Sequence, residues 1–244
     1  MLDKQSFISL LNSVFAANGR SGLLNLEKSE KFFELTVRML EENEKYNLTA
    51  ITEVDKIVLN HYLDCAMLSS YIKKGATILD VGCGAGFPTL PLAIVREDLT
   101  ILGMDSTAKR ISYVNETATM LGLSGVKAVT MRAEDGARLG EYRESFDYVT
   151  ARAVAELRIL SELCLPYVRV GGQFIAMKGK NAEFELAGAK KAISILGGRN
   201  QHSESIELKG QGETFSHPLI IIDKKEKTPS TYPRPYAQIS KKPL

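Results

Sequence analysis

The sequence predicts a doubly wound α/β fold, in which a mostly parallel sheet ends in an antiparallel hairpin and is preceded by a helical extension. Three observations predict it. Residues 1–75 carry apolar side chains at helical spacing, residues 76–196 alternate short apolar runs with helical patterns, and two more apolar runs follow with a short turn between them. Strict alternation of strand and helix is typical of a parallel sheet covered on both faces.

Three helices are expected in residues 1–75, because apolar side chains recur there at a period near 3.6. We interpret these stripes as surfaces that face a core. The three stripes consist of Phe7, Leu10, Leu11, Val14 and Phe15; of Phe33, Val37 and Leu40 after a polar break near residues 19–25; and of Val54, Ile57, Val58, Tyr62, Cys65 and Leu68.

Five strands and three helices are expected next, followed by a hairpin. The strands are "ATILDVG" (76–82), "LTILGMD" (99–105), "VKAVTMRAE" (126–134), "FDYVTARA" (146–153) and "GGQFIAMKG" (171–179). The first of the three helices carries the stripe Ile111, Val114, Ala118 and Leu121, with Ser106 as its N-cap. The second helix is expected over residues 155–168 and the third over residues 181–196. The hairpin pairs "ESIELKG" (204–210) with "HPLIIIDK" (217–224) across "QGETFS" (211–216).

Composition limits the class of protein. A chain of 244 residues that is 44% hydrophobic can bury a full core, and no apolar run approaches the roughly 18 residues that span a bilayer. The start of the sequence, "MLDKQSFISL", lacks the apolar region of a signal peptide, so we expect a cytoplasmic protein. The three cysteines lie far apart, which predicts buried thiols rather than disulfides or a metal site.

We expect three parts: a helical region (1–75) packed on the core, a sheet domain (76–223) and a basic tail (224–244). Residues 223–244 carry a net charge of +4, which leaves −2 for the rest, and hold four of the eight prolines. The prolines predict that this tail forms neither a helix nor a central strand. An extended basic segment either contacts polyphosphate or only improves solubility.

A glycine-rich loop, within "DVGCGAGFPTLPLAI" (80–94), follows the first expected strand. Gly82 and Gly84 match the first two glycines of the dinucleotide fingerprint, but Phe87 occupies the position of the third and blocks the close crossing that a pyrophosphate needs. No "GK[ST]" follows, so a phosphate-binding P-loop is excluded. A nucleotide ligand without a pyrophosphate remains, and S-adenosylmethionine is the common one.

Two acids after the next strands fit the same ligand. Asp105 ends the second strand, about 20 residues after the loop, where a carboxylate can accept both ribose hydroxyls. Glu134 follows the third strand, where its loop should meet the adenine, and Ala133 leaves room beside the ring. The alternative for each acid is a solvated loop residue.

Seven short motifs resemble one family. They are "NLTAI" (47–51), "HYLDC" (61–65), the glycine loop, "DSTAKR" (105–110), "RAED" (132–135), "TARAVA" (150–155) and "YPR" (232–234). In order and spacing they are similar to the glucose-inhibited division protein B family, bacterial methyltransferases that modify N7 of a guanine in small-subunit ribosomal RNA. The resemblance implies a Rossmann-like class I methyltransferase sheet and S-adenosylmethionine as cofactor. Its implied cofactor residues are Gly82, Phe87, Ala133, Glu134 and Arg152.

The resemblance also implies ribosomal RNA as partner, either within a 30S subunit or within an assembly intermediate, and we expect a monomer. Guanine N7 carries a lone pair and no proton, so we expect no catalytic side chain, and the three histidines are interpreted as structural or surface residues. Arg152 is expected to face the acceptor, or else to pair with Glu134 or Asp135. The residues expected to contact RNA phosphates are Lys109, Arg110, Lys178 and Arg234.

Other functions stay open. One is a methyltransferase that acts on another RNA or on a small molecule, and another is a non-catalytic RNA-binding protein that keeps the cofactor fold. An NAD-dependent oxidoreductase ranks lowest because of Phe87.

Overall fold

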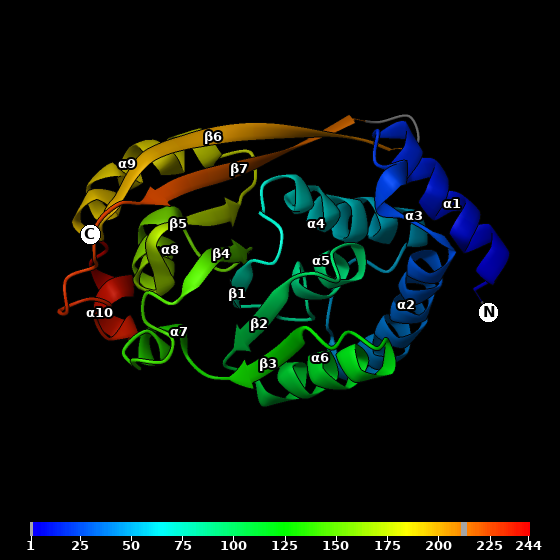
Figure 1. Ribbon diagram of the computed structural model, residues 1–244, viewed down its shortest axis with the longest axis horizontal. Helices are drawn as coiled ribbons and strands as arrows, with labels where there is room; N and C mark the ends of the chain where they lie inside the picture. Colours follow the sequence, from blue (N-terminus) through cyan, green and yellow to red (C-terminus); the bar gives the residue numbers. More distant parts are fainter. Residues whose placement is uncertain (1, 211–213) are drawn as a thin grey trace.

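The described residues, 2–210 and 214–244 of this computed structural model, form one seven-stranded sheet (Figure 1). Its order is β3-β2-β1-β4-β5-β7-β6; β1 to β5 are parallel, and β7 runs antiparallel to β5 and β6. The predicted fold class is therefore confirmed. The strands are β1 Thr77–Val81, β2 Thr100–Asp105, β3 Val126–Thr130, β4 Phe146–Arg152, β5 Val168–Met177, β6 Gly198–Lys209 and β7 Thr214–Lys224.

Side chains of the parallel strands alternate between two cores. Ile78 and its register partners Ile101 and Tyr148 face the core shared with the N-terminal helices, whereas Leu79 and its partner Val149 face the other core. Because successive side chains of a strand point to opposite faces, both faces must be covered. This explains why the strands are apolar throughout rather than alternately polar.

The helices cover both faces of the sheet. On the first face lie α1 Lys4–Ala17, η1 Ser21–Leu23, α2 Leu26–Tyr46, α3 Val54–Ile57, η2 Val58–Leu63, α4 Asp64–Met67, η3 Leu68–Ser70, α5 Thr89–Val95 and α6 Ala108–Met120. On the second face lie α7 Ala133–Gly136, α8 Leu157–Cys164, η4 Leu165–Tyr167, α9 Ala182–Ile195 and α10 Tyr236–Lys241. None of the helices in the described ranges is long and apolar enough to cross a membrane.

The buried face of α2 differs from the predicted one. Phe32, Leu35 and Met39 are fully buried, whereas Phe33 and Leu40 are only partly buried. The buried face also includes Ser29 and Thr36, and the Thr36 hydroxyl donates to the Phe32 carbonyl at 2.8 Å. A polar residue with its hydrogen bond satisfied can occupy a core position. Because Thr36 interrupts the apolar pattern of the buried face, the sequence favoured the wrong face of the helix.

Other helix ends also differ. The N-cap of α6 is Thr107 rather than Ser106, and the Asp105 carboxylate accepts the Thr107 backbone N–H at 2.8 Å, so the residue that ends β2 also orders the turn into α6. The helix expected over residues 155–168 is the shorter α8 followed by η4, whereas α9 lies within one residue of the prediction at each end. The predicted hairpin is β6 and β7; residues 211–213 of its turn lie outside the described residues, and Thr214 to Ser216 belong to β7.

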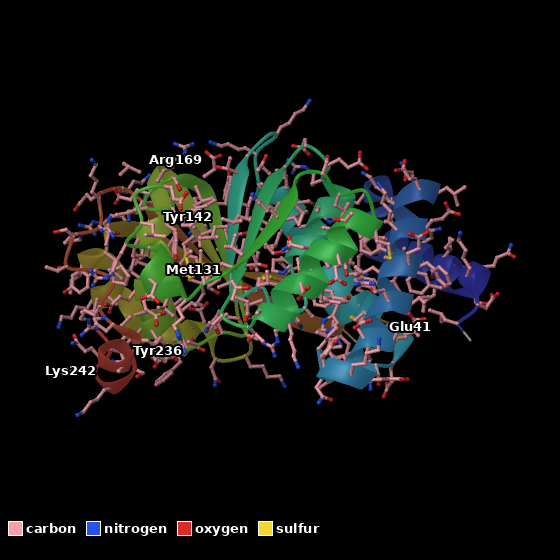
Figure 2. The ribbon with its side chains drawn as sticks, turned by 90° about the horizontal axis from the view of Figure 1, so that it is seen from below. Glu41, Met131, Tyr142, Arg169, Tyr236 and Lys242 are labelled. Carbon is pink, nitrogen blue, oxygen red and sulfur yellow. The ribbon has the colours of Figure 1, made fainter. Side chains whose placement is uncertain are left out.

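The tail contradicts the prediction of an extended segment without a helix. A six-residue helix, α10, begins directly after Pro235 and ends before Pro243. Proline is tolerated at the edges of a helix, where its missing N–H is not needed. Figure 2 shows Tyr236 and Lys242 of this region at the opposite end of the molecule from Glu41 of α2.

The tail is also docked on the body. Arg143 donates to the carbonyls of Thr228, Pro229 and Tyr232 at 2.9–3.2 Å, and Ile239 of α10 is fully buried. Buried backbone carbonyls need donors, and a guanidinium supplies several in a fixed geometry.

Candidate functional site

Three glycines shape the loop after β1, two by allowing close packing and one by leaving open space. Gly82, Gly84 and Gly86 all have positive φ, of 71°, 54° and 86°. A Cβ on Gly82 would lie 2.5 Å from a methyl of Val154, and one on Gly86 would lie 2.6 Å from Leu90, so both glycines allow close packing within the protein. A Cβ on Gly84 would meet nothing nearer than 3.9 Å. Gly84 therefore leaves its backbone open to a ligand.

A cleft opens where the strand order reverses. β1 lies between β2 and β4, and ligands of doubly wound sheets bind beyond the carboxyl ends of the strands at such a point. The cleft has a volume of about 1170 Å³, with walls from the glycine loop, the helical segment 54–70, and the ends of β4, β5 and β7. The predicted site residues that line it are Gly82, Gly84, Phe87, Arg110, Arg152 and Lys178.

Asp105 ties the loop after β1 to the loop after β2. One carboxylate oxygen accepts the Gly84 N–H at 3.2 Å, the other accepts the Thr107 N–H, and Arg110 lies 3.8 Å away. A carboxylate has about four lone-pair sites. Acceptor capacity thus remains for two hydroxyls beside Gly84, which fits the ribose of the expected cofactor.

Ala133 and Glu134 lie in the first turn of α7, just beyond the end of β3. The Ala133 carbonyl accepts the Tyr167 hydroxyl at 2.6 Å, which fixes the turn against the second core. The succession β1, β2, β3 in the sheet orders Gly84, Asp105 and Glu134 along one edge. These residues fit a ligand extended along that edge.

A buried acid holds the base of the glycine loop. Asp80, the fourth residue of β1, accepts hydroxyl hydrogens from Thr89 at 2.7 Å and Thr150 at 3.2 Å. Burial raises the pKa of Asp80 to about 6, against the lowering effect of these two donors. The acid joins β1, α5 and β4 beneath the cleft.

Phe87 belongs to a ring cluster on the other wall of the cleft. The His61 ring stacks on it with centroids 4.5 Å apart and planes 22° apart, and the Arg152 guanidinium lies 5.3 Å from its centre. Arg152 also donates to the Asn60 carbonyl at 3.0 Å and approaches His61 Nδ1 at 3.2 Å. Phe87 is therefore held in a fixed position at the end of the loop.

His61 is neutral and its tautomer is fixed. Burial, with the nearby Arg152 charge, lowers the pKa of His61 to about 4. Because a guanidinium can only donate, His61 Nδ1 must accept, so the ring proton is on Nε2, which donates to Thr49 Oγ1 at 3.0 Å.

Asp64 joins this cluster to the C-terminal hairpin. One of its carboxylate oxygens accepts from His217 Nδ1 at 2.9 Å, and the other lies 3.6 Å from Arg152. Asp64 is only 1% exposed. Its carboxylate raises the pKa of His217 above the usual value, against the opposing effect of burial. The expected alternative partners of Arg152, Glu134 and Asp135, are thus wrong, since its acidic partner is Asp64.

The sequence did not indicate that Thr49, His61, Asp64 and His217 line the cleft, although "NLTAI" and "HYLDC" contain the first three. One signal was present. His61 and Asp64 are polar residues within the apolar stripe of a core-facing helix, and a buried polar group requires a partner.

Of the four residues expected to contact phosphates, Arg110 and Lys178 line the cleft, whereas Lys109 and Arg234 do not. Lys109 lies over the Tyr46 ring at 5.5 Å, and Arg110 lines the cleft. Lys178 donates to the Ala155 carbonyl at 2.8 Å and pairs with Glu185 at 2.6 Å. Arg234 grips the fully buried Glu162 of α8 at 2.6–2.9 Å and thereby anchors the tail.

All three cysteines are free and buried, as predicted. Burial raises the pKa of the Cys83 thiol, which lines the cleft, so it is neutral there. Residues 2–210 and 214–244 contain no cluster of histidine, cysteine and acidic side chains suited to a metal ion.

Comparison with known proteins gives the family. The family model described as rRNA small subunit methyltransferase G matches residues 7–213. The relative named ribosomal RNA small subunit methyltransferase G from Clostridium perfringens (strain 13 / Type A) is 48% identical over 222 residues, covering 90% of this chain and 92% of the relative. Those of the same name from Staphylococcus carnosus and Clostridium novyi are 45% and 40% identical and cover 91% and 100% of this chain, and 92% and 100% of their own.

Solved structures agree on the fold. An S-adenosylmethionine-dependent O-methyltransferase from Thermotoga maritima gives a TM-score of 0.53 at 14% identity and covers 78% of this chain and 72% of its own. A predicted O-methyltransferase from Agrobacterium tumefaciens gives 0.53 at 17% identity and covers 68% and 82%. The resemblance found in the motifs is confirmed: the chain belongs to the rRNA small subunit methyltransferase G family, and it is a methyltransferase whose cofactor is S-adenosylmethionine.

Proposed function

We propose that this chain methylates N7 of a guanine in 16S ribosomal RNA. The observation that carries the proposal is the chemistry of the cleft wall around Phe87. His61 is a weak base whose Nδ1 already accepts from Arg152, Asp64 is paired with His217 and Arg152, and the Cys83 thiol is neutral. A wall of this kind suits an acceptor atom that has a lone pair and no proton to lose.

We infer that the cofactor binds beside this cleft, along the glycine loop and the loops that follow β2 and β3. Its ribose hydroxyls would lie against Asp105, its backbone partner would be Gly84, and its adenine would lie beside Ala133 and Glu134. Gly82, Phe87 and Arg152 would then surround the reactive end. When bound, S-adenosylmethionine would supply a methyl group on a positively charged sulfur. The lone pair of guanine N7 would form the new N–C bond as the C–S bond breaks and S-adenosylhomocysteine leaves, which requires neither an acid nor a base. The protein's contribution is then to orient the acceptor and exclude water, which can supply a large part of a rate enhancement.

RNA phosphates would contact Lys109 and Arg110 at the rim of the cleft. Lys178 and Arg234 would each have to exchange an ion-pair partner within the protein for a phosphate, because Lys178 pairs with Glu185 and Arg234 pairs with Glu162. The proposal includes a monomeric enzyme in the cytoplasm that acts on the 30S subunit or an assembly intermediate.

The experiment is a methylation assay with labelled S-adenosylmethionine and 30S subunits or 16S RNA from cells that lack the gene, followed by mass spectrometry of the nucleosides. We expect 7-methylguanosine at one position. A methyl group on another atom, or labelling of small molecules only, would contradict the proposal. Sedimentation of the enzyme alone tests the monomer.

A further inference from the structure

Two exposed aromatic side chains lie within four residues, along the chain, of residues that line the cleft. Phe184, the third residue of α9, is 83% exposed, and Tyr46, the last residue of α2, is 44% exposed. Large aromatic side chains are usually well buried, and exposed ones mark interaction sites when other features of a surface agree.

The chain places both residues next to the cleft. Residues 178–180 connect the end of β5 to α9 and line the cleft, so Phe184 lies within one helical turn of its wall. Leu48 and Thr49, directly after Tyr46, line the cleft from another side. Figure 1 shows α9 on one side of the sheet and α2 on the other.

Phe184 has no role in the packing of α9. The inward face of this helix consists of Ala182, Leu186 and Ala189, which are buried in the second core. Glu185 turns toward the body, where it pairs with Lys178 and accepts the Leu157 N–H at 2.8 Å. Folding therefore gives no reason for a phenylalanine at position 184.

Positive charge accompanies both rings. The exposed Lys180 precedes Phe184 by four residues and lines the cleft. Lys109 lies over the Tyr46 ring, and Arg110, the next residue, lines the cleft as well. Glu183 is the acidic neighbour of Phe184 and is exposed beside it. Aromatic rings interleaved with cations around a cleft are the pattern that binds unpaired nucleotides.

We propose that Phe184 and Tyr46 are stacking platforms for the nucleotides that flank the target guanine, with Lys180 and the Lys109–Arg110 pair on the neighbouring phosphates. The inference rests on the proposed function, because it assumes that the acceptor is a base in an RNA strand. A base that enters the cleft must leave its stack, and its neighbours lose a stacking partner. An aromatic ring on each side of the cleft replaces that partner.

The test compares three variants at position 184 with a remote control. Phe184→Ala removes the ring, Phe184→Leu keeps an apolar side chain without a flat face, and Phe184→Tyr keeps the ring. Leu26→Ala is the control, because Leu26 is 69% exposed at the other end of α2, about 30 Å from Tyr46. The measurements are RNA affinity as a function of salt, the KM for 16S RNA or 30S subunits, S-adenosylmethionine affinity and melting temperature.

We expect Phe184→Ala and Phe184→Leu to weaken RNA binding by about 5-fold or more, as loss of one base stack does, with an unchanged salt slope. Tyr46→Ala should behave alike, Phe184→Tyr and Leu26→Ala should bind as the unchanged protein, and S-adenosylmethionine affinity should not move. Lys180→Ala should instead lower the log–log salt slope by about one.

Wild-type RNA affinity in Phe184→Ala would overturn the inference, and wild-type affinity in Phe184→Leu would show an apolar contact in place of stacking. Either result leaves the proposed function intact if the unchanged protein still makes 7-methylguanosine. If the unchanged protein makes no 7-methylguanosine, the proposed function itself is wrong, and the methylation assay detects this outcome separately.

Discussion

The carboxylate of Asp64 lies 3.6 Å from the guanidinium of Arg152, and both side chains border the cleft. The pair joins the helical segment 54–70 to the end of β4. Through His217 the same carboxylate holds β7, so one buried acid connects three walls of the site.

Asp64→Asn should destabilise the protein by about 1–3 kcal/mol, because it removes the charge that pairs with both Arg152 and His217 while keeping the size of the side chain. Urea unfolding measures the change. Glu156→Gln, at the exposed pair with Arg158, is the control and should change stability by less than about 0.5 kcal/mol. Equal effects of the two substitutions on the free energy of unfolding would show that the Asp64 contacts do not stabilise the fold.

The Asp64–His217 contact should make stability depend on pH. Asp64 raises the pKa of His217 in the folded protein, so the stabilisation is fully present below the unfolded value near 6.5 and is lost as the pH rises through the folded value. The difference in unfolding free energy between the protein and His217→Gln should thus be larger at pH 6 than at pH 9. A difference that grows with pH would contradict this assignment.

The contribution of His61 to stability should decrease as the pH falls, whereas that of His217 should increase. Its pKa is lowered to about 4 in the folded protein, so the unfolded chain takes up a proton first as the pH falls below 6.5. At pH 5 this should cost roughly 2 kcal/mol relative to pH 8, at 1.36 kcal/mol per pKa unit. The stability advantage of the protein over His61→Gln should shrink between pH 8 and pH 5, and a constant advantage would mean that His61 is not buried in its neutral form.

Gly84→Ala should abolish most S-adenosylmethionine binding with little loss of fold. The new Cβ has space within the protein but would occupy the side of the loop where we propose that the cofactor binds, and the positive φ costs about 1–2 kcal/mol. Gly122→Ala is the matched control, with φ 65° and no atom near its Cβ. Calorimetry should show equal stability losses in the two variants and lost affinity only in Gly84→Ala. Normal S-adenosylmethionine affinity in Gly84→Ala would show that the cofactor does not bind against this loop.

Arg234→Ala should release the tail. The substitution removes the guanidinium that pairs with the fully buried Glu162 carboxylate and leaves only the backbone N–H of residue 234 as donor, so we expect a loss of about 3 kcal/mol of stability. Lys241→Ala, on the exposed part of α10, should leave stability unchanged. If both variants unfold like the unchanged protein, Arg234 is free to serve another role such as a phosphate contact.

The features predicted correctly from the sequence are those set by residues close together in the chain, such as the ends of α9 and the loops that follow strands. The ends of α9 lie within one residue of the predicted range 181–196, because the helical pattern is local. Gly84 and Asp105 lie together because parallel strands end at one edge of the sheet. The Asp64–His217 contact joins residues 153 apart, and the Arg152–His61 contact joins residues 91 apart. Such pairings arise from the packing of layers, which local patterns do not encode.

The most direct test of the account is the pH dependence of a single turnover of methyl transfer, with enzyme and S-adenosylmethionine saturating over 16S RNA. Acid–base enzymes give bell-shaped profiles because two groups must hold particular protonation states. Here the acceptor needs no deprotonation, so the rate should vary by less than about threefold between about pH 6.5 and 8.5, on both sides of the unperturbed histidine value. A tenfold change that disappears in His61→Gln or His217→Gln would show that a side chain moves a proton and that the acceptor atom is not N7.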